Sequence, residues 1–560
     1  MLIADLVLLN GKVITADPKD SVAEAVAVES SRVVKVGSNH QIKRLIGKTT
    51  AIIDVRGKTV TPGLIDTHAH FAESGINQVY VLNLRYPSVK SIAEAVKLVK
   101  TQTEKTPRGR WVQGAGWDEA LFDERRYITR WDLDPVSSDH PVLLEHTSGH
   151  YIAVNTYALH LANVTRDTPQ PNGGTIVKDP DTGEPIGVFI EPPAMDIITN
   201  LVPPWTVEEA EAGIKKAQKL FLSEGVTTIK DPGVGDVTFA AYRNLRSRGE
   251  LKMRIYMLYT VDSLANTEEA VKHLNKGGDN LMKLGGLKMF LDGSGMGRTA
   301  WVHKDWNKNF TDKDTGNRGY PVIKLEEFRK MVKVGHKAGF QICVHAIGDR
   351  AVDETLSTYE AALAEVHREN SRHSIIHAIL PTNNALQKME KLGNNVVIET
   401  QSPFLYFIGD NYAGNFGPNR SRRLIPLKSM LKKGITVGNG SDWSVCPFPP
   451  RFGLWGAVVR KTWKGLYGLQ PFGTEESITV KEALRTYTTM AARCLFMEDA
   501  IGSIEPGKYA DFAVWSGDIY TVDVEALKDL TVEMTIVGQE VVYRDPSSNI
   551  DVAEAPEKSC

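Results

Sequence analysis

The sequence has few cysteines and no long hydrophobic run. Its 560 residues include four cysteines, Cys343, Cys446, Cys494 and Cys560, and no two of them form a CxxC pair. This spacing indicates neither a disulfide framework nor a thiolate zinc site, and it suits a reducing cytoplasm best. No apolar run reaches the roughly 18 residues that a membrane-spanning helix needs. We therefore expect a cytoplasmic protein that does not span a membrane.

An excess of charge of either sign is also missing. The chain has 66 basic and 68 acidic residues and a formal net charge of −2, so its charge does not favour nucleic acid or an anionic membrane as a partner. The first residues, Met1 to Leu6, contain an acid but no basic stretch, and we expect no signal peptide. A hydrophobic content of 42% is that of an ordinary globular protein.

The two ends of the chain share a β-rich pattern. In residues 1–57, short apolar runs are separated by turn residues such as Asn10-Gly11, which is a hairpin signal between two apolar runs. Residues 491–548 contain similar runs, for example Val532 to Val537. Because chain termini often lie close together, we predict one β-sandwich built from both ends, followed by a tail over residues 549–560.

Between the ends, residues 58–490 contain short, apolar, β-branched segments that alternate with helical patterns. Such segments are typical of strands buried on both faces, and eight of them predict a distorted (β/α)8 TIM barrel of the α/β class. The candidate strands are Lys58–Ile65, Val226–Lys230, Arg254–Tyr259, Gly286–Leu291, Phe340–Val344, Ser374–His377, Asn395–Glu399 and Ile435–Val437.

The interval between the first two predicted strands is far longer than a βα connection needs. Residues from about 75 to 205 must therefore carry a large insertion after barrel strand 1. Insertions into βα loops lie over the face of a barrel where chemistry takes place, so we expect this one to shape a pocket.

Polar side chains follow several of the predicted strands at that same face. His68 and His70 come after the first strand, and residues i and i+2 of an extended chain point to the same side. The later strands supply Lys288, His345, His377 and Asp442. A single histidine after a strand more often belongs to the core or rim, and a single aspartate after Gly-Ser is usually a turn or cap residue. The joint pattern predicts a metal site, because imidazole is a common ligand of zinc and similar ions.

Four segments give the chain a resemblance to a known family. They are Pro62–His70, Lys288–Ala300, His345–Ala351 and Gly502–Asp511. With these motifs the sequence resembles the amidohydrolase superfamily, and within it the branch of YtcJ-like hydrolases and N-substituted formamide deformylase. The resemblance covers nearly the whole chain and implies a distorted (β/α)8 barrel, a flanking β-sandwich and a water activated by metal.

The resemblance also implies a role for each ligand. His68, His70 and Asp442 would hold the more buried metal, and His345 and His377 the more exposed one. Lys288 occupies the position at which the superfamily places a carboxylated lysine between two metals, whereas an unmodified lysine would favour a single metal. The expected cofactor is therefore one or two divalent ions per chain, with zinc as the preferred metal.

Two segments depart from the branch, and both concern the substrate. Thr400–Phe404 lacks a histidine where the branch commonly has Gln-Pro-His, and His146 occupies a position where arginine or another polar residue would be expected. Trp117, His150 and Asp292 are candidates for the lining of the substrate pocket. An equally good interpretation is that these three residues only pack and form hydrogen bonds in the rim of the site.

The predicted reaction is metal-assisted hydrolysis of a small-molecule substrate. A bound metal lowers the pKa of water and polarises a carbonyl, and Asp442 would carry a proton from that water to the leaving nitrogen. We expect the bond to be a non-peptide C–N bond in an N-formyl or N-acyl amide. The alternatives are a deaminase or cyclic-amide hydrolase, an ester or lactone hydrolase, and a non-catalytic metal-binding barrel. A homodimer is expected from the resemblance alone.

Overall fold

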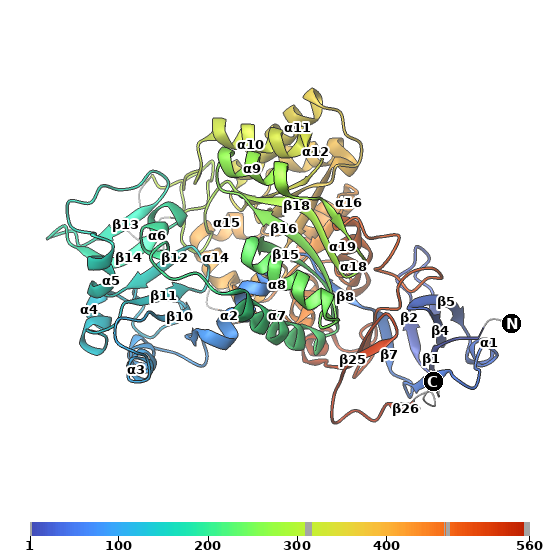
Figure 1. The fold of residues 1–560 in the computed structure, drawn as a ribbon. Helices are drawn as coiled ribbons and strands as arrows, with labels where there is room; N and C mark the ends of the chain where they lie inside the picture. Colours follow the sequence, from blue (N-terminus) through green and yellow to red (C-terminus); the bar gives the residue numbers. More distant parts are fainter. Residues whose placement is uncertain (1–2, 308–315, 464, 466–470, 554–560) are drawn as a thin grey trace.

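A sheet of eight parallel strands forms the centre of the molecule. The structure is a computed structural model and describes residues 3–307, 316–463, 465 and 471–553 (Figure 1). The strands follow the order β8-β15-β16-β18-β19-β20-β21-β22, and the short β17 (Gly277–Gly278) pairs with β18. Their bounds are β8 Leu64–Asp66, β15 Val226–Val234, β16 Arg254–Thr260, β18 Met282–Phe290, β19 Gln341–Ala346, β20 His373–His377, β21 Val396–Thr400 and β22 Val437–Asn439.

The two edge strands of this sheet meet at their carboxyl ends. The amide of Thr67, just after β8, donates a hydrogen bond to the carbonyl of Asn439 in β22 at 3.1 Å. The sheet is therefore a nearly closed barrel, which confirms the predicted distorted (β/α)8 fold. Within the described residues, no helix is both long and apolar enough to cross a bilayer.

Helices cover the outside of the barrel. The longer ones are α2 Phe71–Tyr80, α7 Val207–Leu222, α8 Asp236–Ser247, α9 Leu264–His273, α10 Leu325–Lys337, α11 Asp349–Glu365, α12 Asn383–Leu392 and α17 Pro450–Val459. The shorter ones are α13 Pro403–Phe407, α14 Gly409–Phe416, α15 Pro418–Ser421, α16 Leu427–Lys432, α18 Val480–Thr486 and α19 Thr489–Cys494. Helix α7 begins with a capping box between Thr206 and Glu209, which satisfies backbone donors at its start.

Helix α2 follows the first histidines directly and packs closely on α7. A Cβ on Gly75 of α2 would lie 2.2 Å from the carbonyl oxygen of Gly213 in α7. A Cβ on Gly213 would lie 2.5 Å from the backbone nitrogen of Ile76. The two glycines therefore allow the backbones to approach, and this contact fixes the helix that begins beside the site.

The first barrel strand differs from its predicted bounds. We predicted Lys58–Ile65, but Thr59–Pro62 forms β7 of a flanking sheet and only Leu64–Asp66 belongs to the barrel. A Cβ on Gly63, between the two strands, would lie 2.2 Å from Oγ1 of Thr227. All residues of both strands are buried, so the apolar run gives no sign of the change from one sheet to the other.

Both ends of the chain build two flanking sheets. Their strand orders are β26-β6-β1-β4-β5 and β25-β24-β23-β7-β2-β3. The bounds are β1 Leu6–Leu9, β2 Lys12–Ile14, β3 Val22–Ala23, β4 Ala25–Glu29, β5 Arg32–Gly37, α1 Asn39–Lys43, β6 Ala51–Asp54, β7 Thr59–Pro62, β23 Phe512–Trp515, β24 Val532–Val537, β25 Glu540–Arg544 and β26 Asp551–Ala553. One hydrophobic core includes Leu8 and Val26 of the first sheet and Phe512 and Ile536 of the second. The flanking sandwich is therefore built from both ends: β1 and β26, from the two ends of the described chain, both pair with β6 (Figure 1).

The predicted tail is partly structured. We expected residues 549–560 to form a tail, but Asp551–Ala553 forms β26, which pairs antiparallel with β6. This pairing satisfies backbone hydrogen-bonding groups of residues 551–553. Their polar sequence alone does not indicate a strand. Residues 554–560 lie outside the described part of the chain.

The insertion after β8 and α2 forms a sheet of its own. Its strand order is β13-β14-β12-β11-β10-β9. The bounds are β9 Leu82–Asn83, α3 Ile92–Thr103, β10 Val112–Trp117, α4 Arg130–Leu133, β11 Val142–His146, β12 Tyr151–Val154, α5 Thr156–Leu161, β13 Thr175–Lys178, β14 Pro185–Ile190 and α6 Pro192–Thr199. It has a separate hydrophobic core that includes Val112, Trp117 and Leu144. Figure 1 shows this unit on the side of the barrel away from the terminal sheets.

A buried ion pair joins the barrel to the terminal sheets. Arg254 in β16 donates from Nε and Nη2 to the two carboxylate oxygens of Asp511, at 2.7 and 2.8 Å. Oδ1 of Asp511 also accepts the backbone N–H of Gly538 at 2.9 Å. The side chains of Arg254 and Asp511 are only 2% and 4% exposed. Each charge therefore depends on the other for stabilisation.

We predict that Asp511→Asn destabilises the protein by about 3–5 kcal/mol, because it leaves the Arg254 charge buried without its counter-ion. Urea denaturation followed by circular dichroism measures this change. Asp551→Asn is the matched control, since it disrupts an ion pair with Arg56 in which both side chains are about half exposed. The control should leave the denaturation midpoint nearly unchanged. Equal effects of the two substitutions would contradict the role of the buried pair.

Candidate metal centre

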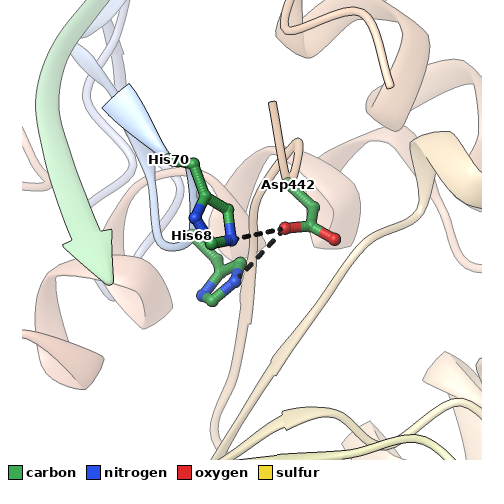
Figure 2. Close-up of side chains that lie close together, drawn as sticks. All are labelled: His68, His70 and Asp442. Carbon is green, nitrogen blue, oxygen red and sulfur yellow. Dashed lines mark ion pairs between the residues drawn. The ribbon is translucent and has the colours of Figure 1, made fainter. Parts of the chain in front are cut away.

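The structure brings the six predicted ligand side chains to one end of the barrel. They are His68 and His70 after β8, Lys288 in β18, His345 in β19, His377 in β20 and Asp442 after β22. Nε2 of His68 and Nε2 of His70 lie 3.3 and 3.5 Å from the same oxygen, Oδ1 of Asp442 (Figure 2). One ligand atom from each of these three residues lies within 4.8 Å of the others, close enough to hold a single ion.

The backbone around this group is tied together by Asp66, the last residue of β8. Its carboxylate accepts the backbone N–H of His68 at 3.0 Å and that of Ser441 at 3.1 Å. The N–H of Asp442 in turn donates to the carbonyl of His68 at 2.7 Å. These bonds fix the ends of β8 and β22 relative to each other, so they position His68 and Asp442 on facing sides of the group.

Two of the predicted ligand residues have backbone angles that non-glycine residues seldom adopt. The φ angle is +77° at His377 and +54° at Asp442, both in the left-handed region. Such conformations persist only where the surrounding structure imposes them, and they occur often at functional sites.

His345 and His377 form a second pair of imidazoles next to the first group. Nδ1 of His377 donates to Oε1 of Gln401 at 2.7 Å, and Nε2 of His345 donates to the carbonyl of Gly293 at 3.2 Å. The Gln401 amide is oriented by its own Nε2, which donates to the carbonyl of Glu399 at 3.3 Å. In the neutral imidazoles the remaining nitrogens, Nδ1 of His345 and Nε2 of His377, then carry lone pairs.

These two lone pairs face each other. Nδ1 of His345 and Nε2 of His377 lie 3.0 Å apart. Two facing lone pairs repel unless a cation lies between or beside them, and the residues therefore fit a metal ion. The ring of His377 is also 5.4 Å from the ring of His68, so this pair adjoins the group of His68, His70 and Asp442.

Burial keeps these imidazoles in the form that binds metals. It lowers the pKa values of His68, His345 and His377 well below the usual range. A neutral imidazole has a lone pair to donate, whereas an imidazolium has none. Neither ring nitrogen of His68 forms a hydrogen bond with a described residue. Nitrogen and carboxylate donors of this kind suit Zn²⁺.

Lys288 is buried at the inner side of the site. It is 1% exposed, and its Nζ makes no hydrogen bond to any described residue. Burial lowers the pKa of Lys288 to about 8, even though Asp442 acts in the opposite direction. An ammonium buried without a counter-ion is costly. Burial therefore makes the neutral amine easier to reach than in an exposed lysine.

A second group of possible ligands lies in the insertion and comprises Asp118, Glu119 and His146. Nδ1 of His146 accepts the backbone N–H of Ser148 at 3.0 Å, so in the neutral ring Nε2 carries the hydrogen. Nε2 lies 3.1 Å from Oε2 of Glu119. Neither Nε2 of His146 nor Oε2 of Glu119 makes a hydrogen bond to a described residue, so this group is a second, separate candidate site.

A cavity of about 210 Å³ opens beside the first group. His70, His345, His377 and Asp442 line it, while His68 lies deeper and is 0% exposed. The insertion supplies residues 145–150 of the wall, and α2 supplies several residues of the opposite side. A substrate must enter this cavity to reach Asp442, so these two segments decide which molecules fit.

The cavity wall also carries charged side chains that are not predicted from the sequence. Arg85 donates from Nε and Nη2 to the carbonyl of Ser444, at 3.1 and 2.7 Å. Burial and the nearby Glu73 raise the pKa of Glu145 to about 7. Arg85 and Glu73 come from the segment after His70, where sequence gives no sign of which side chains turn inward. The sequence around Gln401 indicates only that a histidine is absent there, because the contact of Gln401 with His377 depends on tertiary structure.

Of the three predicted pocket residues, only His150 lines the cavity. Its Nδ1 lies 2.7 Å from Oε2 of the buried Glu191, which orients the ring. Asp292 is 0% exposed and accepts the backbone N–H groups of Trp301, Ile347 and Gly348 at 2.8–3.0 Å. It therefore anchors the loop after His345 rather than lining the pocket.

Trp117 also requires a correction. We expected it at the pocket, but it is 0% exposed in the core of the insertion, and its indole N–H donates to the carbonyl of Leu144 at 2.9 Å. It packs edge-on against His146, at 4.9 Å between ring centroids. Trp117 therefore supports a wall residue and offers no surface to a substrate.

Comparisons with known proteins agree with this architecture. A model of the amidohydrolase family matches residues 51–543. Putative amidohydrolase YtcJ of Bacillus subtilis is 30% identical over 527 residues, which cover 93% of this chain and 96% of that protein. N-substituted formamide deformylase of Arthrobacter pascens is 27% identical over 562 residues, or 97% and 99% of the two chains. The branch predicted from the sequence is thus confirmed.

Among solved structures, an uncharacterized metal-dependent hydrolase from Pyrococcus horikoshii is similar over 93% of this chain and 99% of its own, with a TM-score of 0.73 and 26% identity. The match of the family model extends from the terminal sheets through the whole barrel. The chain therefore belongs to the amidohydrolase family of metal-dependent hydrolases.

Proposed function

We propose that this protein hydrolyses a non-peptide C–N bond, in an N-formyl or N-acyl amide of a small molecule. The observation that carries the proposal is the position of Asp442, which faces two imidazoles and also lines the cavity. A carboxylate in this position can act both as a ligand and as a base. The name of the deformylase relative, an enzyme for N-substituted formamides, supports the choice of bond.

The residues present would hold one or two divalent ions, with zinc as the preferred metal. His68, His70 and Asp442 would hold one ion, and His345 and His377 a second. A divalent ion bound there lowers the pKa of a water molecule and polarises the carbonyl that the water attacks. The unbonded nitrogens of His68 and the facing lone pairs of His345 and His377 support this assignment.

Asp442 would then move the proton. Its carboxylate takes a proton from the attacking water and gives it to the nitrogen that leaves, which is general base and then general acid catalysis by one group. The backbone bond from its N–H to the His68 carbonyl and the left-handed φ angle fix its place. Gln401 keeps the His377 ring in the orientation that presents Nε2 to the site.

Lys288 would become a ligand through carboxylation. Its neutral amine adds to CO₂, a new N–C bond forms and a proton leaves, so an amine becomes an anionic oxygen donor. The modification would explain why an amine is buried here without a hydrogen bond to any described residue. It would also favour two metals over one.

Location and assembly complete the proposal. The three described cysteines, Cys343, Cys446 and Cys494, are buried and unpaired, which supports a reducing compartment such as the cytoplasm. The proposal that the protein forms a homodimer rests on the resemblance to the family. Light scattering of the purified protein tests it.

We predict that Asp442→Asn lowers kcat on an N-formyl amine by at least about 10²-fold, because the amide can neither accept nor return the proton. Steady-state kinetics on the zinc-loaded protein measure the loss. Asp236→Asn makes the same chemical change in an exposed residue of α8, outside the site, and should keep full activity. An Asp442→Asn protein with wild-type kcat would refute the role of this carboxylate.

Metal content should depend on bicarbonate. We predict that the protein refolded with zinc binds two ions per chain when bicarbonate is present and fewer in CO₂-free buffer, because carboxylation of Lys288 supplies a ligand. Lys288→Met should remove the difference. Lys283→Met, a half-buried lysine of the same strand, should retain it. One ion per chain in both buffers would contradict the carboxylated lysine.

A further inference from the structure

An aromatic cleft lies next to the metal-centre cavity. Its volume is about 280 Å³. Five aromatic side chains line it: Tyr86, Phe407, Trp443, Phe448 and Trp463. Trp463 makes edge contacts with Tyr86 and Phe407, at 5.6 and 5.7 Å between ring centroids, and Trp443 does the same with Phe448 at 5.5 Å. The cleft thus has an extended apolar surface, in contrast to the charged wall of the cavity.

The cleft and the cavity share part of their wall. Arg85, Thr147 and Val445 line both. Val445 is also close to the proposed catalytic carboxylate along the chain, because its N–H donates to the carbonyl of Asp442 at 2.7 Å. A hydrogen bond from residue i+3 to residue i defines a turn whose ends lie within about 7 Å. The reacting centre and the nearest wall of the cleft are therefore a few ångströms apart.

The Arg85 side chain, which lines both the cavity and the cleft, is held in a defined position. The Arg85 guanidinium donates to the carbonyl of Ser444, and its stem crosses Gly116, where a Cβ would lie 2.3 Å from Cγ of Arg85. Gly116 also has a φ angle of +101°, which a residue with a side chain seldom adopts. This arrangement keeps the long arginine side chain against Gly116 of the insertion and away from the aromatic rings of the cleft.

Among the five described rings of the cleft, Trp463 is the exposed one. Trp463 is 40% exposed, and the free energy falls when apolar surface of this kind is removed from water. The volume of the cleft is smaller than the 300–1,000 Å³ typical of a complete ligand pocket, so it suits one part of a ligand. An aromatic ring or a short branched alkyl group has the size and chemistry to fill it.

We propose that the aromatic cleft binds an apolar, preferably aromatic substituent of the substrate whose amide group lies at the metal centre. The inference rests on the proposed function, which it narrows to amides with a bulky apolar group close to the scissile bond. The occupant is argued from adjacency, since Thr147 and Val445 line both the cavity and the cleft. The polar cavity then receives the amide, and the cleft receives the hydrophobic part.

The test compares two formamides that share the reacting group, N-methylformamide and N-(2-phenylethyl)formamide. We expect the wild type to have a KM at least about tenfold lower for the phenylethyl compound, since burial of a few methylene equivalents is worth that factor. Trp463→Ala should raise this KM about tenfold and leave the kinetics of N-methylformamide unchanged. Trp463→Phe should restore most of the affinity, because it keeps an aromatic ring in the cleft. This variant keeps the test valid if the alanine variant folds poorly.

Trp131→Ala is the matched control. Trp131 belongs to α4 of the insertion, is 49% exposed and does not line the cleft, so its loss should change neither substrate. Calorimetric titration with 2-phenylethylamine and methylamine gives a second measurement that does not require turnover. The phenylethyl amine should bind more tightly, and Trp463→Ala should remove the advantage.

The outcomes separate this inference from the proposed function. If neither formamide is hydrolysed but the Trp463-dependent preference for 2-phenylethylamine is present, the proposed function fails and the subsite stands. If both formamides are hydrolysed with similar KM, or if Trp463→Ala affects both alike, the subsite is refuted while the function stands. A Trp463→Ala protein with a changed mass in light scattering would assign the cleft to a contact between copies of the chain, and would refute the inference as well.

Discussion

The facing lone pairs of His345 and His377 are the constraint on which the site depends. The two nitrogens lie 3.0 Å apart, and the opposite nitrogens donate to the Gly293 carbonyl and to Gln401. Burial disfavours an added proton on either ring. A metal ion bound there would relieve the repulsion and would be coordinated by both nitrogens. The hydrogen bonds that orient these rings therefore hold two nitrogen lone pairs in a position where no described protein group donates a hydrogen bond to them. This arrangement is unfavourable for folding in the absence of a cation.

The rest of the fold supports this arrangement in two separate ways. The barrel supplies ligands at the ends of its strands, and Asp66 fixes the first and last strands to each other beside them. The insertion supplies the cavity wall, with His150 oriented by Glu191 and Arg85 held against Ser444. The candidate metal ligands thus lie in or directly after the barrel strands, whereas the walls of the cavity lie on loops and on the insertion. This division agrees with the way barrel enzymes vary their substrates.

Much of this could be predicted from the sequence, and the failures have physical reasons. The barrel strands were found because strands buried on both faces must be apolar along their whole length. The boundary near Gly63 was missed because β7 and β8 are equally buried, although they belong to different sheets. The six candidate ligands could be grouped from the sequence because parallel strands bring their carboxyl ends together, whatever their spacing along the chain. Gln401 and Arg85 were missed because their roles depend on contacts between segments far apart. Trp117 was misplaced because sequence does not show which face of β10 is turned to the core of the insertion.

The central claim is that the imidazoles of His68, His70, His345 and His377 and the carboxylate of Asp442 hold metal. Crystals of the zinc-loaded protein, measured on both sides of the zinc absorption edge, test it most directly. The account predicts anomalous density among these five side chains, within about 2.0–2.2 Å of nitrogen and carboxylate donors. Anomalous density only at Asp118, Glu119 and His146 in the insertion, with none among the five, would contradict it.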